Sequence, residues 1–71
     1  MDEQKKPASR VWADGDGGVL RALAPRNVPP ARSAAYVITS DDGIYLTAAQ
    51  CRAVAAHLTE LADYHEHKET P

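Results

Sequence analysis

Apolar residues recur with the period of an α-helix in the second half of the sequence. Counted at about 100° per residue from Cys51, seven positions share an arc of roughly 120°. They are Cys51, Val54, Ala55, Leu58, Leu61, Ala62 and His65. Just before them, Thr47 and Gln50 have the spacing of a capping box, in which each side chain accepts a hydrogen bond from the other residue's backbone N–H. The pattern predicts an amphipathic helix that begins after Thr47 and buries Cys51 as a small apolar side chain.

Three short segments of strand-forming residues precede the helix. Residues 10–13 and 19–23 flank the loop D-G-D-G-G, and this arrangement predicts a first hairpin. Residues 24–33 hold three prolines, which exclude a helix interior or a central strand and predict a connection. Residues 34–40 contain β-branched and aromatic side chains and predict the best strand of the chain.

A turn at residues 40–43 leads from that strand into residues 44–46, which also have strand propensity. Two registers are open for a second hairpin: a two-residue loop at Asp42 and Gly43, or a three-residue loop with Gly43 in the left-handed conformation and a bulge. The second register is preferred because it keeps Asp41 off the aliphatic face. It predicts one face against the helix, with Tyr36, Ile38, Ile44 and Leu46, and another with Val37, Thr39 and Tyr45.

Together these segments predict an α+β fold. We expect a small antiparallel sheet of three to four strands, in two hairpins, packed by one C-terminal amphipathic helix. Residues 1–9 are polar and predict a disordered tail, residues 10–67 form a single domain, and residues 68–71 are a frayed C-terminus.

The core of this domain must be small. The 71 residues include only 12 leucines, isoleucines and valines and no phenylalanine. Small domains bury a low fraction of their surface, and many gain stability from additional burial. We therefore expect a homodimer, formed through the remaining apolar face or through a strand edge.

Charge and cysteine content limit the compartment and the partners. The formal net charge is −2, and there is a single cysteine. Residues 1–40 carry about +2 and residues 41–71 about −4, so the helix is the acidic part. No apolar signal segment or membrane span is apparent, and we expect a cytoplasmic protein in a bacterium or a phage-infected host.

No arrangement of residues predicts catalysis or a cofactor. There is no Ser-His-Asp pattern, phosphate-binding loop or carboxylate pair on an evident pocket, so we do not expect an enzyme. Asp14 and Asp16 have the spacing of the first two ligands of a calcium loop, but Gly18, Val19 and Pro25 occupy the places of the later ligand, the glycine and the glutamate. The three histidines lack the i, i+4 spacing of a metal-binding pair, and we expect no metal site.

Two surfaces are candidates for contact with a partner protein. One is the flank of the helix beside its apolar face, and the other is the sheet face away from the helix, where apolar side chains would otherwise meet water. The candidate interface residues are Trp12, Val37, Tyr45, His57, Glu60 and Tyr64. For Tyr64 the alternative is that its ring covers the edge of the core without a partner.

The segment from residue 43 to residue 63 resembles small uncharacterised sheet-plus-helix proteins of actinobacteria and their phages, in which a strand leads into a helix of the pattern L-T-x-x-Q/E-A-R. The matching residues are Leu46, Thr47, Gln50, Arg52, Leu58, Leu61, Ala62 and Asp63. Cys51 and Val54 depart from the pattern, where alanine and leucine are usual. The resemblance covers about a third of the chain; it implies a compact fold and an actinobacterial or phage setting, and no activity.

These observations predict a small non-enzymatic factor, phage-encoded or accessory, that binds or inhibits a host protein. The alternative is a nucleic-acid-associated transcriptional regulator that uses Arg21, Arg26 and Arg32, which lie in a stretch without acidic residues. Duplex binding normally needs a clustered basic surface, and the overall acidity of the chain argues against it. A protein partner is therefore the main expectation, with no membrane contact.

Overall fold

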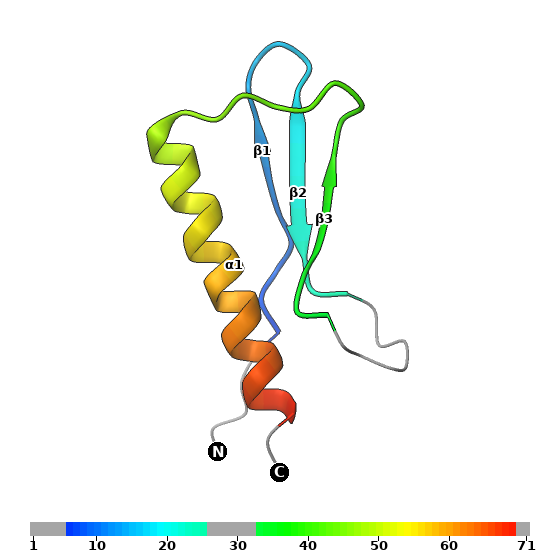
Figure 1. The fold of residues 1–71 in the computed structure, drawn as a ribbon, viewed down its shortest axis with the longest axis vertical. Helices are drawn as coiled ribbons and strands as arrows, with labels where there is room; N and C mark the ends of the chain where they lie inside the picture. The colour runs from blue at the N-terminus through cyan, green and yellow to red at the C-terminus, as the bar shows by residue number, and fades with distance from the viewer. Residues whose placement is uncertain (1–5, 26–32, 70–71) are drawn as a thin grey trace.

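The computed structural model describes residues 6–25 and 33–69 of the chain, with side chains up to residue 67 (Figure 1). Strands β1 (Arg10–Ala13), β2 (Val19–Leu23) and β3 (Tyr36–Thr39) are followed by one helix, α1 (Ala48–Glu69). The strands form one sheet in the order β1-β2-β3, and both neighbouring pairs are antiparallel. The predicted α+β fold with a single C-terminal helix is confirmed, and the sheet has three strands.

The first hairpin has the bounds that the sequence predicts. Arg10 lies opposite Ala22 and Ala13 lies opposite Val19, and residues 14–18 form the loop between them. Gly15 and Gly17 have φ angles of +87° and +92°, which glycine adopts without the steric cost that a side chain would add. Glycine at these positions therefore explains why the loop can close so tightly.

The predicted second hairpin is wrong, although its turn is present. Gly43 has a φ of +82°, and its N–H donates to the Ser40 carbonyl at 2.9 Å. Residues 44–47 form no strand and cross from the turn to α1 (Figure 1). β3 pairs instead with β2, and the pairing continues into Ser40, whose N–H donates to the Val19 carbonyl at 3.0 Å. This pairing places β2 between two neighbours, so its backbone groups are satisfied on both sides.

The new pairing also reverses the predicted faces of β3. Val37 lies opposite Ala22 and Thr39 opposite Leu20, so both point toward the helix side of the sheet. Tyr36 and Ile38 point away from α1, where the sequence predicted the opposite. Side chains alternate between the two faces along a strand, so the register in which β3 pairs with β2 decides which alternate set shares the side of Leu20 and Ala22.

The predicted capping box is confirmed at the start of α1. The Gln50 N–H donates to Thr47 Oγ1 at 3.1 Å, and the Thr47 N–H donates to Gln50 Oε1 at 2.9 Å. Gln50 also uses its amide nitrogen, which donates to the Ala13 carbonyl at 3.0 Å. This one side chain therefore caps the helix and ties its first turn to the end of β1.

α1 packs on β2 with one side of the predicted face, extended to His57. The core consists of Leu20, Ala22, Ala24 and Leu61, and Trp12, Ala35, Ile44 and Leu58 pack around it. Cys51 is exposed, which corrects the prediction that it is buried. The buried helix positions are Val54, His57 and Leu61, so the centre of the contact face is turned by about 70° from that of the predicted one. Ala22 and Ala24 leave room on the sheet for the larger side chains of His57 and Leu61.

Candidate functional site

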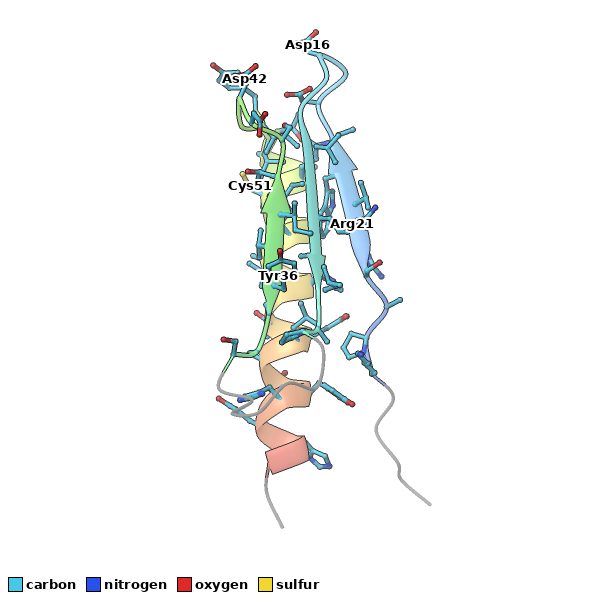
Figure 2. The ribbon with its side chains drawn as sticks, turned by 90° about the vertical axis from the view of Figure 1, so that its right-hand side faces the viewer. Asp16, Arg21, Tyr36, Asp42 and Cys51 are labelled. Carbon is cyan, nitrogen blue, oxygen red and sulfur yellow. The ribbon has the colours of Figure 1, made fainter. Side chains whose placement is uncertain are left out.

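α1 covers one side of the sheet, and within residues 6–25 and 33–69 no element packs on the other side. In Figure 2 the three strands lie in front of α1, and the labelled Arg21 and Tyr36 belong to the strands on the near side. Exposed fractions on this side are 52% for Val11, 39% for Val19, 56% for Tyr36 and 41% for Ile38. We call this surface the open face; it consists of Val11, Val19, Arg21, Leu23, Tyr36 and Ile38.

Arg21 occupies the centre of the open face. It lies on the middle strand, directly opposite Val11 on β1 and Ile38 on β3. Val19 and Leu23 are its neighbours on the same side of β2, because side chains two residues apart share a face. Among the residues that the structure describes, Arg21 forms no ion pair. The open face is therefore an aliphatic surface with one unpaired guanidinium in its middle.

The predicted interface residues do not form one surface. Val37 is 46% exposed but lies on the helix side of the sheet, and Tyr45 is 85% exposed in the crossing segment. Glu60 is exposed on α1 and Tyr64 is half-buried there. Trp12 is half-buried on the helix side and packs against the core. Of the arginines suggested for nucleic acid, Arg26 and Arg32 fall outside the described residues.

His57, a predicted interface residue, is instead part of the protein interior. It is 2% exposed, and its ring centroid lies 5.7 Å from that of Trp12. Nε2 lies 3.0 Å from the Ala22 carbonyl oxygen; because a carbonyl can only accept, Nε2 carries the proton of this hydrogen bond. Nδ1 is buried without a hydrogen bond, and the Glu60 carboxylate is 3.7 Å away. His57 therefore joins helix and sheet and offers no contact to a partner.

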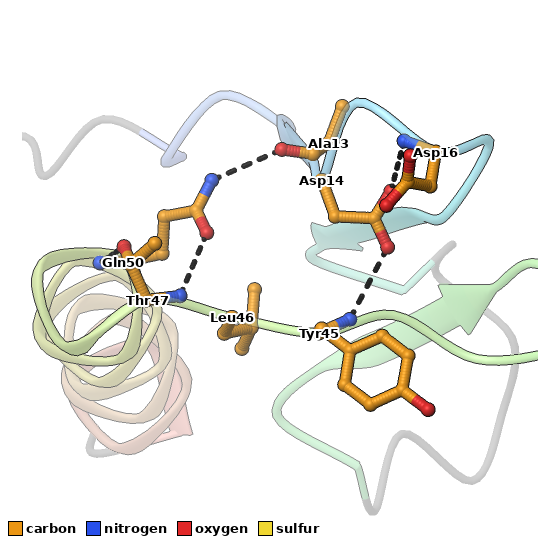
Figure 3. Close-up of a pocket in the computed structure, with 7 residues that line it drawn as sticks. All are labelled: Ala13, Asp14, Asp16, Tyr45, Leu46, Thr47 and Gln50. Atoms are coloured by element: carbon orange, nitrogen blue, oxygen red, sulfur yellow. Dashed lines mark hydrogen bonds between the residues drawn. The ribbon is translucent and has the colours of Figure 1, made fainter.

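The loop end of the molecule contains two adjoining pockets with acidic walls. The first, of about 360 Å³, is lined by residues of the β1–β2 loop, the crossing segment and the helix cap (Figure 3). The second, of about 270 Å³, shares Asp14, Asp16 and Tyr45 with it and extends to the turn with Asp41 and Asp42. Four aspartates thus surround this end of the sheet.

The carboxylate of Asp14 organises these loops. Oδ1 accepts hydrogen bonds from the N–H of Asp16 at 2.7 Å and of Gly18 at 2.9 Å, and Oδ2 accepts one from the N–H of Tyr45 at 3.3 Å. Gly18 has no room for a side chain, because a Cβ atom there would approach the Asp14 carboxylate and lie 2.9 Å from the Gly43 oxygen. Within the described ranges, no three His, Cys, Asp or Glu side chains gather as metal ligands would. The aspartate therefore acts as a clamp between segments.

Asp14 should make stability depend on pH in the acid range. The hydrogen bond from the Asp16 N–H, and next the one from Tyr45, hold the pKa of the Asp14 carboxyl below its ordinary value of 3.8. Because the pKa is lower in the folded state, the carboxylate stabilises the fold fully above that value, and the contribution is lost as the pH falls through the lowered pKa. We expect Asp14→Asn to flatten the decline in the free energy of unfolding between about pH 4 and pH 2. Urea denaturation at several pH values measures the free energy of unfolding of both proteins.

Asp16→Asn is the matched control for this experiment, since it removes a neighbouring charge and leaves the Asp14 clamp in place. In the Asp16→Asn protein the free energy of unfolding should fall with pH as it does in the unmodified protein. Identical pH profiles for the unmodified and Asp14→Asn proteins would show that the clamp contributes nothing to the acid response.

The sequence predicts a candidate interface on the sheet face away from the helix but assigns Trp12, Val37 and Tyr45 to it, none of which lies there, although β2 carries a signal for the correct residues. Leu20 and Ala22 on β2 and Ala24 just after it are all apolar and alternate, whereas Arg21 falls on the opposite set. An arginine in the middle of a strand points away from the only packing layer, so this alternation identifies which side of β2 faces α1. No such alternation in the sequence predicts that β3 pairs with β2.

Comparison with protein-family models, with curated proteins and with solved structures gives no match for this chain. α1 is the one helix in the described ranges, and it is not long and apolar enough to cross a membrane.

Proposed function

We propose that this chain is a small non-enzymatic interaction protein that binds another protein through the open face. The observation that supports the proposal is that, in the part of the chain that the structure describes, α1 packs on one side of the sheet, and aliphatic and aromatic side chains on the other side are exposed. Monomeric proteins rarely keep large contiguous apolar surfaces exposed unless these bind something. The resemblance to actinobacterial and phage proteins suggests an accessory or phage-encoded factor that acts on a host protein.

The chemistry of the open face restricts the partner. A partner that covers Val11 and Ile38 also covers Arg21 between them, and it removes water from the guanidinium. A buried charge without a counter-charge is costly, whereas a carboxylate can accept two parallel hydrogen bonds from arginine. The binding segment should therefore present apolar side chains around one aspartate or glutamate.

Two groups suited to acid–base chemistry are engaged in structural bonds. His57 is buried and donates to the Ala22 carbonyl, and Asp14 accepts three backbone hydrogen bonds. A general base needs a free site within reach of a substrate proton. The arrangement of these side chains favours binding over catalysis as the function.

Nucleic-acid binding is the second candidate, and it would use the same surface. Tyr36 and Arg21 share the open face, and an exposed ring beside a guanidinium can stack on an unpaired base. Such binding would weaken steeply with salt, because phosphate contacts release counterions. A labelled single-stranded oligonucleotide, titrated at low and at high salt, distinguishes this candidate from a protein partner.

The test of the main proposal is site-specific photo-crosslinking. p-Benzoylphenylalanine replaces Tyr36 on the open face or, as the control, Thr59, which is exposed on α1. Crosslinking in lysate of the source cells, followed by mass spectrometry, should identify a protein joined to position 36 and absent at position 59. Ile38→Asp should then weaken binding of that purified protein by about tenfold or more, and Thr59→Asp should leave it unchanged.

Circular dichroism of each variant separates loss of binding from loss of folding. A partner that crosslinks only at position 59, or whose affinity is the same for the Ile38→Asp protein, would overturn the assignment to the open face.

A further inference from the structure

β3 is an edge strand, and its outward backbone groups can be identified. The Ser40 N–H donates to the Val19 carbonyl, so residues 40 and 19 form a hydrogen-bonded pair of the antiparallel ladder. Such pairs alternate along the strands, which makes Ile38 with Arg21 the next pair. Val37 and Thr39 therefore direct their N–H and C=O groups away from β2. In the described part of the chain no backbone hydrogen bond reaches these groups.

This edge lacks the features that keep exposed strands from pairing. β3 has the sequence Y-V-I-T, and all four residues are exposed. It contains no charged residue, no proline and no positive-φ residue that would mark a bulge. Natural proteins usually protect such an edge with one of these features or cover it. The opposite edge of the sheet, β1, begins with the exposed Arg10.

The edge is complementary to itself under two-fold symmetry. Consider a two-fold axis that passes beside Ile38 and runs perpendicular to the sheet. Val37 of one copy then lies opposite Thr39 of the other. The outward N–H and C=O groups of these residues form four hydrogen bonds between the two copies. The two Ile38 side chains then meet on the open face. Because the two β3 strands are antiparallel, the turn with Asp41 and Asp42 of one copy lies at the opposite end of the interface from that of the other copy. The like charges of the two turns are therefore kept apart.

We propose that a second copy of this chain binds along the free edge of β3 and produces a six-stranded antiparallel sheet. Both helices then lie on one side, and the two open faces become one continuous surface on the other. The proposal uses the backbone of β3 and holds whether or not the open face binds a partner. A four-residue strand gives a small interface, so we expect weak association, with a dissociation constant of roughly 10–20 μM.

Amide hydrogen exchange followed by NMR tests the geometry directly. At micromolar protein concentration the N–H groups of Val37 and Thr39 should exchange rapidly, and at millimolar concentration they should be protected about tenfold or more. The N–H of Ile38, which faces β2, should change little. Exchange of Val37 and Thr39 that is independent of protein concentration would overturn the proposal.

A proline at position 37 provides the matched variant. Val37→Pro removes an outward N–H and no hydrogen bond of the β2 ladder, whereas Val37→Thr keeps the N–H and a β-branched shape. Sedimentation equilibrium should show a monomer for Val37→Pro and concentration-dependent association for Val37→Thr. Association that persists in Val37→Pro with a folded circular dichroism spectrum would contradict the proposal, and if that variant does not fold, the exchange experiment decides.

Two further outcomes would assign the contacts elsewhere. Association that shifts the NMR signals of Val11 and Val19 but leaves the Val37 and Thr39 amides unprotected means that two copies meet through the open face, which overturns the edge pairing. Protection of these amides only when the crosslinked partner protein is added means that a strand of that protein occupies the edge, which overturns the choice of a second copy. Val37→Pro leaves the side chains of the open face in place, so failure here is distinguishable from failure of the proposed function.

Discussion

Leu61→Ala should lower the free energy of unfolding by about 2–5 kcal/mol. Leu61 is 0% exposed and is the largest side chain that is fully buried among the described residues. Truncation removes most of its packing in the core cluster with Leu20, Ala22 and Ala24 and leaves a cavity. Because small domains have stabilities of only several kcal/mol, we expect a large fraction of the protein to be unfolded at room temperature. Urea denaturation followed by circular dichroism measures the change.

Leu58→Ala is the matched control for that substitution. Leu58 lies three residues earlier on α1 and is half-buried beside the core. Its truncation removes the same atoms from a site that water already reaches in part, so the loss should be clearly smaller. Equal losses for the two variants would mean that α1 does not use the face centred on His57 and Leu61.

His57→Ala should have the second largest effect, with a loss of about 3 kcal/mol or more in the free energy of unfolding. The substitution removes a buried ring that contacts Trp12 and a hydrogen bond to the Ala22 carbonyl. His57→Phe keeps a ring of similar size and loses only the hydrogen bond, so its cost should be nearer 1 kcal/mol. Chemical denaturation followed by Trp12 fluorescence reports both the stability and the ring contact.

The order of the two His57 variants separates packing from hydrogen bonding. A His57→Phe protein as unstable as His57→Ala would show that the bond to Ala22 is the main contribution of this side chain. If neither substitution lowers stability, His57 is not held between α1 and β2, and the interior position assigned to it is wrong.

Short-range signals in the sequence were sufficient for the first hairpin and for the start of the helix. The turn residues at 14–18 fix β1 and β2 with the bounds expected, and Thr47 with Gln50 fixes the first helical turn. In both cases the deciding hydrogen bonds join residues close together in the chain. Local propensity and turn chemistry are therefore sufficient to predict these elements.

The partner of β3 could not be predicted in this way. The turn at Gly43 forms as expected, but the Val19 N–H donates to Ser40 Oγ and the Tyr45 N–H to Asp14 Oδ2, across 21 and 31 residues. These long-range bonds hold β3 on β2 and draw residues 44–47 away from it. The sequence indicates that each segment can form a strand, and it does not indicate which pairing has the lower free energy.

The helix face was predicted in part: Val54 and Leu61 are buried and Leu58 packs beside the core, whereas Cys51 is exposed and His57 is buried. An alanine-rich helix has no sharp boundary between apolar and polar sides, so leucine and valine positions alone define a broad arc. The sequence places His57 on the flank of that arc, as an interface residue. The residues of the open face were assigned incorrectly for another reason: the side of β3 that faces away from α1 depends on which strand β3 pairs with.

Gln50 and Asp14 join the region of the β1–β2 loop to the segment that leads from β3 into α1. These links affect how quickly the protein unfolds. Gln50 reaches Ala13 across 37 residues, and Asp14 reaches Tyr45 across 31. Closing a chain segment of that length costs about 3 kcal/mol in configurational entropy, before any contact offsets it. We expect contacts that need such a closure to form late in folding, so their loss should act mainly on the rate of unfolding. Gln50→Ala should then speed unfolding in stopped-flow measurements and leave the rate of refolding nearly unchanged, and an equal change in both rates would contradict this expectation.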